Sequence, residues 1–195
     1  MSLDMPPQMQ ERVMCSIAAA AKYEIPANIV LAVAEKENGR PGQWVSNSNG
    51  THDVGPLQFN TAYLGTLARY GITPADVSAA GCYPYDLAAW RLRQHIMKDQ
   101  GDLWTRSANY HSRTPRFNWI YRADLMKRAA SWADWLAAHY LTHDVASPGA
   151  NPTSTLATTS VTTNKPITTP ARQTNPAYWN SSRYVPRKLL IDGQP

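Results

Sequence analysis

This chain's fold is decided by the stretch Pro26-Ala27-Asn28-Ile29-Val30-Leu31-Ala32-Val33-Ala34-Glu35-Lys36-Glu37-Asn38-Gly39. It predicts a helix over about residues 26–38, because proline suits the first position of a helix and glycine suits the residue after its end. At ~100° per residue the apolar side chains form one face, and Glu37 projects onto the middle of that face while Glu35 points the opposite way. A carboxyl group in such a place loses hydration, which raises its pKa. The stretch therefore predicts a general acid at Glu37.

A second interpretation of Glu37 stays open from this helix alone, because an acid in a frayed last turn can simply reach solvent. Two later sequences favour the catalytic interpretation. After Glu37-Asn38-Gly39 come Gly55-Pro56-Leu57-Gln58 and then Ala108-Asn109-Tyr110-His111-Ser112.

In this order, the three sequences resemble the signatures Glu-Ser-Gly, Gly-Leu-Met-Gln and Ala-Tyr-Asn of the lytic transglycosylase family with a lysozyme-like, soluble-transglycosylase catalytic domain. Residues 22–26, which lead into the Glu37 helix, also look like the lead-in of that family. The resemblance spans about residues 8–140. Each motif is weak alone, and their order together with the helix makes the set specific. The resemblance implies a lysozyme-like, mainly α domain that works without a cofactor.

The resemblance also implies a reaction that needs one carboxylate. Glu37 would protonate the oxygen between N-acetylmuramic acid and N-acetylglucosamine, assisted by the substrate's N-acetyl group. It would then take the proton of the muramic 6-hydroxyl as a 1,6-anhydro ring closes, so that no water is consumed. Glycosidases ordinarily use two carboxylates, but the other candidate acids fall in none of the family's motifs: Asp53, Asp76 and Asp86. A hydrolytic lysozyme and a wall-binding scaffold protein without catalysis are the alternative functions.

Five residues are candidates for binding the glycan. Gly55 suits a close approach of the backbone to a sugar, and the amide of Gln58 can hydrogen-bond an N-acetyl or hydroxyl group. Asn38 replaces the serine of the family signature, and its amide can still orient the neighbouring carboxylate. Tyr110 can hydrogen-bond Glu37 or the acetamido group, although a core aromatic and an ordinary Gly-Pro turn are the alternatives for these motifs. Tyr121 resembles the second tyrosine that several members of the family place in the cleft.

Two further departures from the family signatures concern Leu57, which replaces methionine at similar volume, and His111, which replaces asparagine. A histidine there could add positive charge below its pKa, and a structural histidine is the alternative. The histidines and the two distant cysteines show no metal-ligand spacing, so no metal site is expected. Trp44 is the tryptophan best placed for a sugar groove, whereas three others have helical spacing and are expected in the core: Trp90, Trp132 and Trp135.

The pattern along the chain predicts a mainly α domain at residues 1–144, with at most a small β element near residues 43–59. Helices are expected at about residues 8–23, 26–38 and 58–70, then after a cap at Asp86, after Gly101-Asp102, and from Pro115 onward. Residues 145–195 are rich in Thr, Pro and Asn and show no period, so they are predicted to be a disordered C-terminal tail.

The net charge of +5 is concentrated after residue 144, where five basic residues face one acidic residue. Residues 1–144 therefore carry +1 and are not expected to bind nucleic acid, which needs Lys and Arg clustered on one face. Arg91, Arg93 and Lys98 are interpreted as a solvated helix face. We expect a monomer that binds peptidoglycan glycan strands. The tail, through residues 178–191, could dock on proteins of a secretion, conjugation or pilus assembly.

Cys15 and Cys82 suffice for one disulfide bridge if the protein is exported, and otherwise they are small buried residues. Residues 1–7 lack the basic and apolar regions of a secretory signal, so the chain is interpreted as a mature form of a periplasmic or cell-envelope protein. No run of residues approaches the length of a membrane span.

Overall fold

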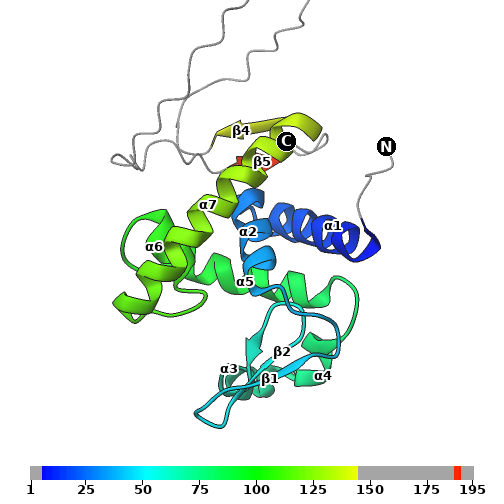
Figure 1. The fold of residues 1–195 in the computed structure, drawn as a ribbon, viewed down its shortest axis with the longest axis vertical. Helices are drawn as coiled ribbons and strands as arrows, with labels where there is room; N and C mark the ends of the chain where they lie inside the picture. The colour runs from blue at the N-terminus through cyan, green and yellow to red at the C-terminus, as the bar shows by residue number, and fades with distance from the viewer. Residues whose placement is uncertain (1–5, 145–186, 190–195) are drawn as a thin grey trace, which may run out of the picture.

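The computed structural model describes residues 6–144 and 187–189, and within them the chain is mainly helical, as predicted, with two small sheets (Figure 1). The elements in chain order are α1 (Pro7–Lys22), α2 (Ala27–Glu37), β1 (Trp44–Ser46), β2 (His52–Val54), β3 (Phe59–Asn60), α3 (Thr61–Leu67), the 3-10 helix η1 (Ala68–Tyr70), α4 (Pro74–Ser78), α5 (Tyr83–Lys98), α6 (Leu103–Ala108), α7 (Pro115–His139), β4 (Thr142–Asp144) and β5 (Arg187–Leu189).

Helix α2 lies at the centre of the helical part, between α1 and α7 and against α5 (Figure 1). Residues 27–34 are each at most 3% exposed, so the helix is covered on every side. The predicted single apolar stripe was too narrow, because Leu31 and Ala32 are also fully buried. A helix that is apolar all round is a core helix, and here only its last turn emerges from the core, carrying Glu37.

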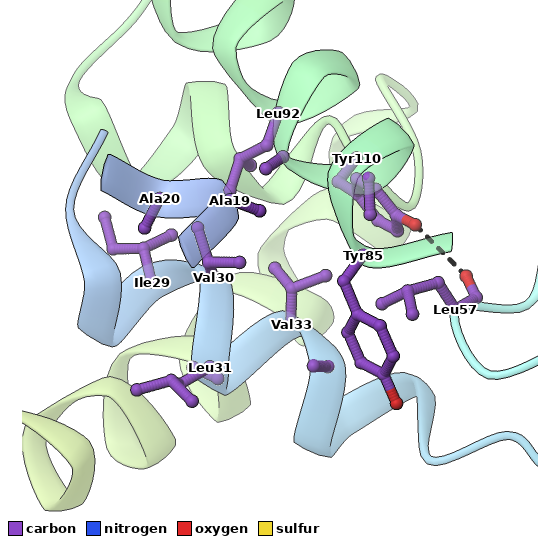
Figure 2. Packing of buried hydrophobic residues seen from close by; sticks show 14 of the residues in the cluster. Ala19, Ala20, Ile29, Val30, Leu31, Val33, Leu57, Tyr85, Leu92 and Tyr110 are labelled. Carbon is purple, nitrogen blue, oxygen red and sulfur yellow. Dashed lines mark hydrogen bonds between the residues drawn. The ribbon is translucent and has the colours of Figure 1, made fainter. Parts of the chain in front are cut away.

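Figure 2 shows how neighbouring elements enclose α2. Ile29 and Val30 lie near Ala19 and Ala20 of α1, while Val33 lies on the side of Tyr85 and Leu57. The only polar side chain within residues 27–34, Asn28, is buried and donates a hydrogen bond to the carbonyl of Ala129 in α7 (3.1 Å). Because this amide is hydrogen-bonded, it fixes how α2 and α7 are aligned, and the free-energy cost of burying an unpaired polar group is avoided.

The end of α2 differs from the prediction by one residue. The cap is Asn38, which adopts a left-handed conformation (φ 47°), a backbone region that asparagine tolerates better than most residues. Gly39 serves a different purpose. A Cβ atom at this position would lie 2.1 Å from the carbonyl oxygen of Gly55 and 2.5 Å from the side-chain amide nitrogen of Gln58. Glycine is required here because two parts of the backbone meet.

The small β element predicted near residues 43–59 is confirmed as the antiparallel sheet β1-β2-β3, with Trp44 opposite Val54 and Asp53 opposite Asn60. The helix predicted from residue 58 instead begins at Thr61. Gln58 has a positive φ (49°), which a helix cannot contain, and the next two residues pair with β2. Asn60 caps α3 by accepting a hydrogen bond from the backbone of Ala62 (3.0 Å).

The other helix signals had mixed outcomes. A helix begins after Gly101-Asp102 and Pro115 opens α7, both as predicted, and Asp102 caps α6 by accepting a hydrogen bond from the backbone of Thr105 (2.7 Å). The cap predicted at Asp86 is wrong, because α5 already begins at Tyr83. Asp86 pairs instead with α1, through Lys22 (2.8 Å) and the hydroxyl of Tyr23 (2.9 Å).

Cys15 and Cys82 form a disulfide bridge, which settles the alternative left open by the sequence. The bridge joins the buried side of α1 to the residue before α5, with the two Cα atoms 4.9 Å apart and 67 residues of sequence separation. It therefore ties together two of the helices that enclose α2.

The end of the described chain returns to the helical part. Residues 187–189, which were assigned to the tail, form β5 and pair antiparallel with β4, with Thr142 opposite Leu189 (Figure 1). The backbone of β5 lies close to that of α2. The rest of the predicted disordered tail, residues 145–186 and 190–195, lies outside the described residues. Of the helices in residues 6–144, none combines the length and hydropathy needed to cross a bilayer.

Candidate active site

Glu37 is the last residue of α2, and its side chain is half-buried. Its Oε1 atom accepts a hydrogen bond from the hydroxyl of Tyr121, a buried residue of α7, at 2.7 Å. The carboxyl group therefore lies where the end of α2 meets α7. Glu35 is committed elsewhere: it pairs with Arg128 and accepts a hydrogen bond from the indole of Trp132 (2.8 Å). The helical period predicts that Glu35 and Glu37 point in opposite directions, and in the structure the two acids contact different residues.

The pKa of Glu37 is raised from 4.5 to about 7, mainly because burial removes water from the carboxylate. The hydrogen bond from Tyr121 and the positive charges of Arg91 and Lys36 act in the opposite direction, while the negative charge of Asp53 raises the pKa further. Glu37 also sits at the C-terminal end of a helix, where the helix dipole disfavours negative charge. A carboxyl group with this pKa is partly protonated at neutral pH and can both give and take a proton.

Arg91 is the positive charge that lowers the pKa of Glu37 most. The prediction that Arg91 belongs to a solvated helix face was wrong. Its guanidinium lies over the rings of Tyr63 (4.1 Å) and Tyr110 (4.6 Å). The helical period could have revealed this placement, because residue 91 follows the buried Leu87 by one turn of α5. A cation stacked on two aromatic rings is held in place and keeps its charge beside the site.

Of the interpretations left open for Tyr110, the structure supports the core aromatic, because its hydroxyl donates to Leu57 and not to Glu37. Tyr110 is 3% exposed and donates its hydroxyl hydrogen bond to the carbonyl of Leu57 (3.1 Å), the contact drawn in Figure 2. Burial raises the pKa of Tyr110 far above that of an ordinary tyrosine, so its phenol remains a donor. Because Leu57 belongs to the second sequence motif, Tyr110 ties the third motif to the second.

The loop that carries Gly55 and Gln58 packs directly on the end of α2. The backbone of Gly39 donates to the carbonyl of Pro56 (3.1 Å), and the side chain of Gln58 donates to the carbonyl of Gly55 (2.8 Å). Gly55 has φ 71°, and a Cβ atom there would lie 2.1 Å from the carbonyl oxygen of Val77. The protein's own backbone therefore requires glycine at position 55, and the turn interpretation of this motif is confirmed.

Asn38 was predicted to orient Glu37, but it is exposed and its side chain bonds elsewhere. Its side-chain oxygen instead accepts a hydrogen bond from Arg12 of α1 (3.0 Å). With the capping role described above, this contact gives Asn38 a structural function. Of the five residues predicted to bind glycan, only Tyr121 is seen to contact the catalytic candidate directly.

Asp53 is a residue of the site that the motifs missed. It lies in the middle of β2, and its carboxylate accepts a hydrogen bond from the side chain of Asn60 (2.8 Å). Its negative charge raises the pKa of both Glu37 and His111, so the Asp53 carboxylate is close enough to both residues to influence them. The sequence signal that could have indicated Asp53 was its position in a short strand, two residues before Gly55.

The tryptophans divide as predicted where the structure tests them. The three expected in the core are partly buried against it: Trp90, Trp132 and Trp135. Trp44 is 51% exposed on β1, with its ring edge-on to His52 (5.8 Å between centroids). Among residues 6–144, no group of three or more acidic, histidine or cysteine side chains is arranged to hold a metal ion.

Replacing Tyr121 with phenylalanine is expected to raise the pKa of Glu37 above about 7. The substitution removes the hydrogen bond that stabilises the carboxylate while keeping the aromatic ring. The titration of Glu37 by carbon NMR of the labelled carboxyl group measures this pKa. Tyr23→Phe is the matched control, because Tyr23 also donates to a carboxylate, that of Asp86, but on the far side of α1. An unchanged Glu37 titration in Tyr121→Phe would contradict the prediction.

No family model matches this chain. It is 30% identical over 101 residues to the protein IpgF of Shigella flexneri, a match that covers 51% of this chain and 66% of IpgF. It is 26% identical over 118 residues to the invasion protein IagB of Salmonella typhimurium, covering 60% of this chain and 70% of IagB. The chain is thus a distant relative of both proteins, and its match spans slightly less than two thirds of IpgF.

Proposed function

We propose that this protein is a peptidoglycan lytic transglycosylase that cleaves the β-1,4 bond between N-acetylmuramic acid and N-acetylglucosamine. The observation that carries the proposal is Glu37, whose pKa is raised to about 7 by burial and which is held by Tyr121 at the junction of α2 and α7. The three sequence signatures support it. Hydrogen bonds connect the three signatures: the backbone of Gly39 donates to the carbonyl of Pro56, and the hydroxyl of Tyr110 donates to the carbonyl of Leu57.

The proposed reaction uses Glu37 twice. Protonated Glu37 first gives its proton to the glycosidic oxygen as the bond from the muramic C1 breaks, and the acetamido oxygen of the same sugar bonds to C1. The 6-hydroxyl then attacks C1, displaces the acetamido oxygen and gives its proton to the Glu37 carboxylate. The products are a 1,6-anhydro ring and a regenerated acid. Between the steps Glu37 is ionised, and Tyr121 and Arg91 stabilise that form.

Asp53 favours a second candidate function, a hydrolytic lysozyme. A second carboxylate facing the acid can assist a water molecule or stabilise the positive charge that develops at C1. Asp53 meets the first requirement of that mechanism, because it is a carboxylate of β2 whose charge acts on Glu37. A wall-binding protein without catalysis is the remaining alternative, and it would pellet with sacculi while releasing no fragments.

Mass spectrometry of the muropeptides released from purified sacculi distinguishes these functions. The transglycosylase proposal expects 1,6-anhydro ends, and a digest containing only reducing ends would replace it with the hydrolase.

Asp53→Asn is expected to lower the rate of turnover without changing the type of product. If catalysis depends on Glu37 and the acetamido group, the variant should still release anhydro ends, with turnover reduced by roughly tenfold or less. Asp134→Asn is the matched control, because Asp134 is an exposed acid of α7 outside the site. Complete loss of cleavage in Asp53→Asn alone would favour the two-carboxylate mechanism.

We further propose that the protein acts in the periplasm or cell envelope, opening the wall locally for a secretion or conjugation assembly. The disulfide between Cys15 and Cys82 supports an oxidising compartment. The similarity to IagB, which is named as an invasion protein, supports the association with such an assembly. Co-purification of assembly proteins with the full chain, and its loss when residues 145–195 are removed, tests the role of the tail.

A further inference from the structure

His111 has a position in the site that neither the structural nor the charge interpretation of this residue anticipated. It follows Tyr110 directly after α6, and its ring lies parallel to that of Tyr121, with 4.9 Å between ring centroids and 3° between planes. Tyr121 in turn holds Glu37. His111 and Glu37 therefore both contact Tyr121, the first through the face of its ring and the second through its hydroxyl.

The edge of the His111 ring is open. The residue is exposed, and among residues 6–144 and 187–189 its ring nitrogens make no hydrogen bond. Two other histidines contrast with it. His95 is 7% exposed and paired through Nδ1 with Asp99 (2.7 Å), and Nδ1 of His139 contacts the carbonyl of Trp135 (2.7 Å). His111 is thus fixed through one face, while its hydrogen-bonding edge remains available.

We propose that His111 is a substrate-contacting residue, whose imidazole edge hydrogen-bonds an acetamido or hydroxyl group of the glycan next to the bond being cleaved. The inference rests on the proposed function and deepens it by assigning recognition of N-acetylated sugar to this position. A neutral imidazole presents one donor and one acceptor. An amide presents the same pair of functions, which makes the acetamido group a matching partner.

The groups around His111 favour its neutral form. Partial burial and the positive charges of Lys36 and Arg91 lower its pKa, and the negative charge of Asp53 opposes them. Lys36 comes from α2, Arg91 from α5 and Asp53 from β2, while the uncharged Tyr121 covers one ring face from α7. Protonation would remove the acceptor and add a charge beside the site. Cleavage therefore requires His111 neutral and Glu37 protonated, which gives a bell-shaped pH profile.

Kinetics on a soluble tetrasaccharide of alternating N-acetylglucosamine and N-acetylmuramic acid test the proposal. His111→Ala is expected to raise KM at least tenfold with a smaller change in kcat. His111→Asn should restore most of the affinity, because the amide of asparagine also offers a donor and an acceptor. It should also remove the acidic limb of the pH profile. His139→Asn is the matched control, a stacked histidine at the other end of α7. An unchanged KM and acidic limb in His111→Ala would overturn the proposal.

A binding measurement separates this inference from the enzymatic one. In Glu37→Gln, labelled at histidine, the same tetrasaccharide is expected to shift the imidazole NMR signals of His111 and leave those of His139 unchanged. If the wild-type protein cleaves glycan and the His111 signals do not move, the inference fails while the proposed function stands. If the signals move but no cleavage occurs at any pH, the proposed function fails and the contact stands. Absence of both overturns both.

Discussion

Glu37→Gln should abolish release of anhydro-muropeptides, with a loss of at least ~100-fold, the usual effect of deleting an acid-base group. The amide keeps the shape of the side chain and still accepts the Tyr121 hydrogen bond, but it has no proton to transfer. Release of fragments from sacculi, quantified by mass spectrometry, measures the effect. Glu35→Gln is the control: it weakens contacts with Arg128 and Trp132 and should leave turnover within a few-fold. The reverse outcome, with Glu35→Gln inactive and Glu37→Gln active, would refute the assignment.

The same substitution is expected to change how stability depends on pH. Because the pKa of Glu37 is about 7 in the folded protein and near 4.5 when unfolded, the folded state binds more protons between these values. The stability contributed by protonated Glu37 is therefore complete below about pH 4.5 and is lost as the pH rises through 7, by up to ~3 kcal/mol. Urea unfolding should show Glu37→Gln more stable than the wild type at pH 8 and similar at pH 4. Parallel curves for the two proteins would mean that the carboxyl is not destabilised by burial.

Loss of the disulfide should be the second large effect. In the chain-entropy model, a bridge closing a loop of this length contributes ~4 kcal/mol. Domains of ordinary size are stable by only about 5–15 kcal/mol, so Cys15→Ser with Cys82→Ser is expected to lower the urea midpoint sharply. Reductant should do the same to the wild type, since Cys82 is exposed, and should not affect the double variant further. Equal midpoints with and without reductant would contradict the prediction.

The sequence predicted the features of this protein that depend on short-range periodicity. The orientation of Glu37, the start of a helix after Gly101-Asp102 and the start of α7 at Pro115 all follow from the 3.6-residue period and from terminal signals, which act within one turn. The predicted helix boundaries were wrong where residues pair with another element. Residues 59–60 were assigned to a helix and instead pair with β2.

The surroundings of Glu37 could not be derived in the same way, because they depend on contacts across the fold. The Tyr121 contact joins residues 84 apart in the sequence and was suggested only by a family resemblance. Arg91 was assigned to solvent because of its charge, although the phase of α5 pointed inward. The glycine at position 55 was predicted to serve a sugar or a turn, and its close approach to Val77, on a segment that follows the sheet, could not be foreseen.

The pairing of β4 with β5 closes a loop of 42 residues between positions 144 and 187. Closing a chain segment of that length costs on the order of 3 kcal/mol in entropy, which the short ladder and the contact with α2 must offset. The tether also keeps β5 at a high effective concentration near its partner strand. A single backbone cut between residues 145 and 186 would turn this intramolecular pairing into association between two chains. β5 would then dissociate on dilution and leave the edge of β4 open to a strand of another protein.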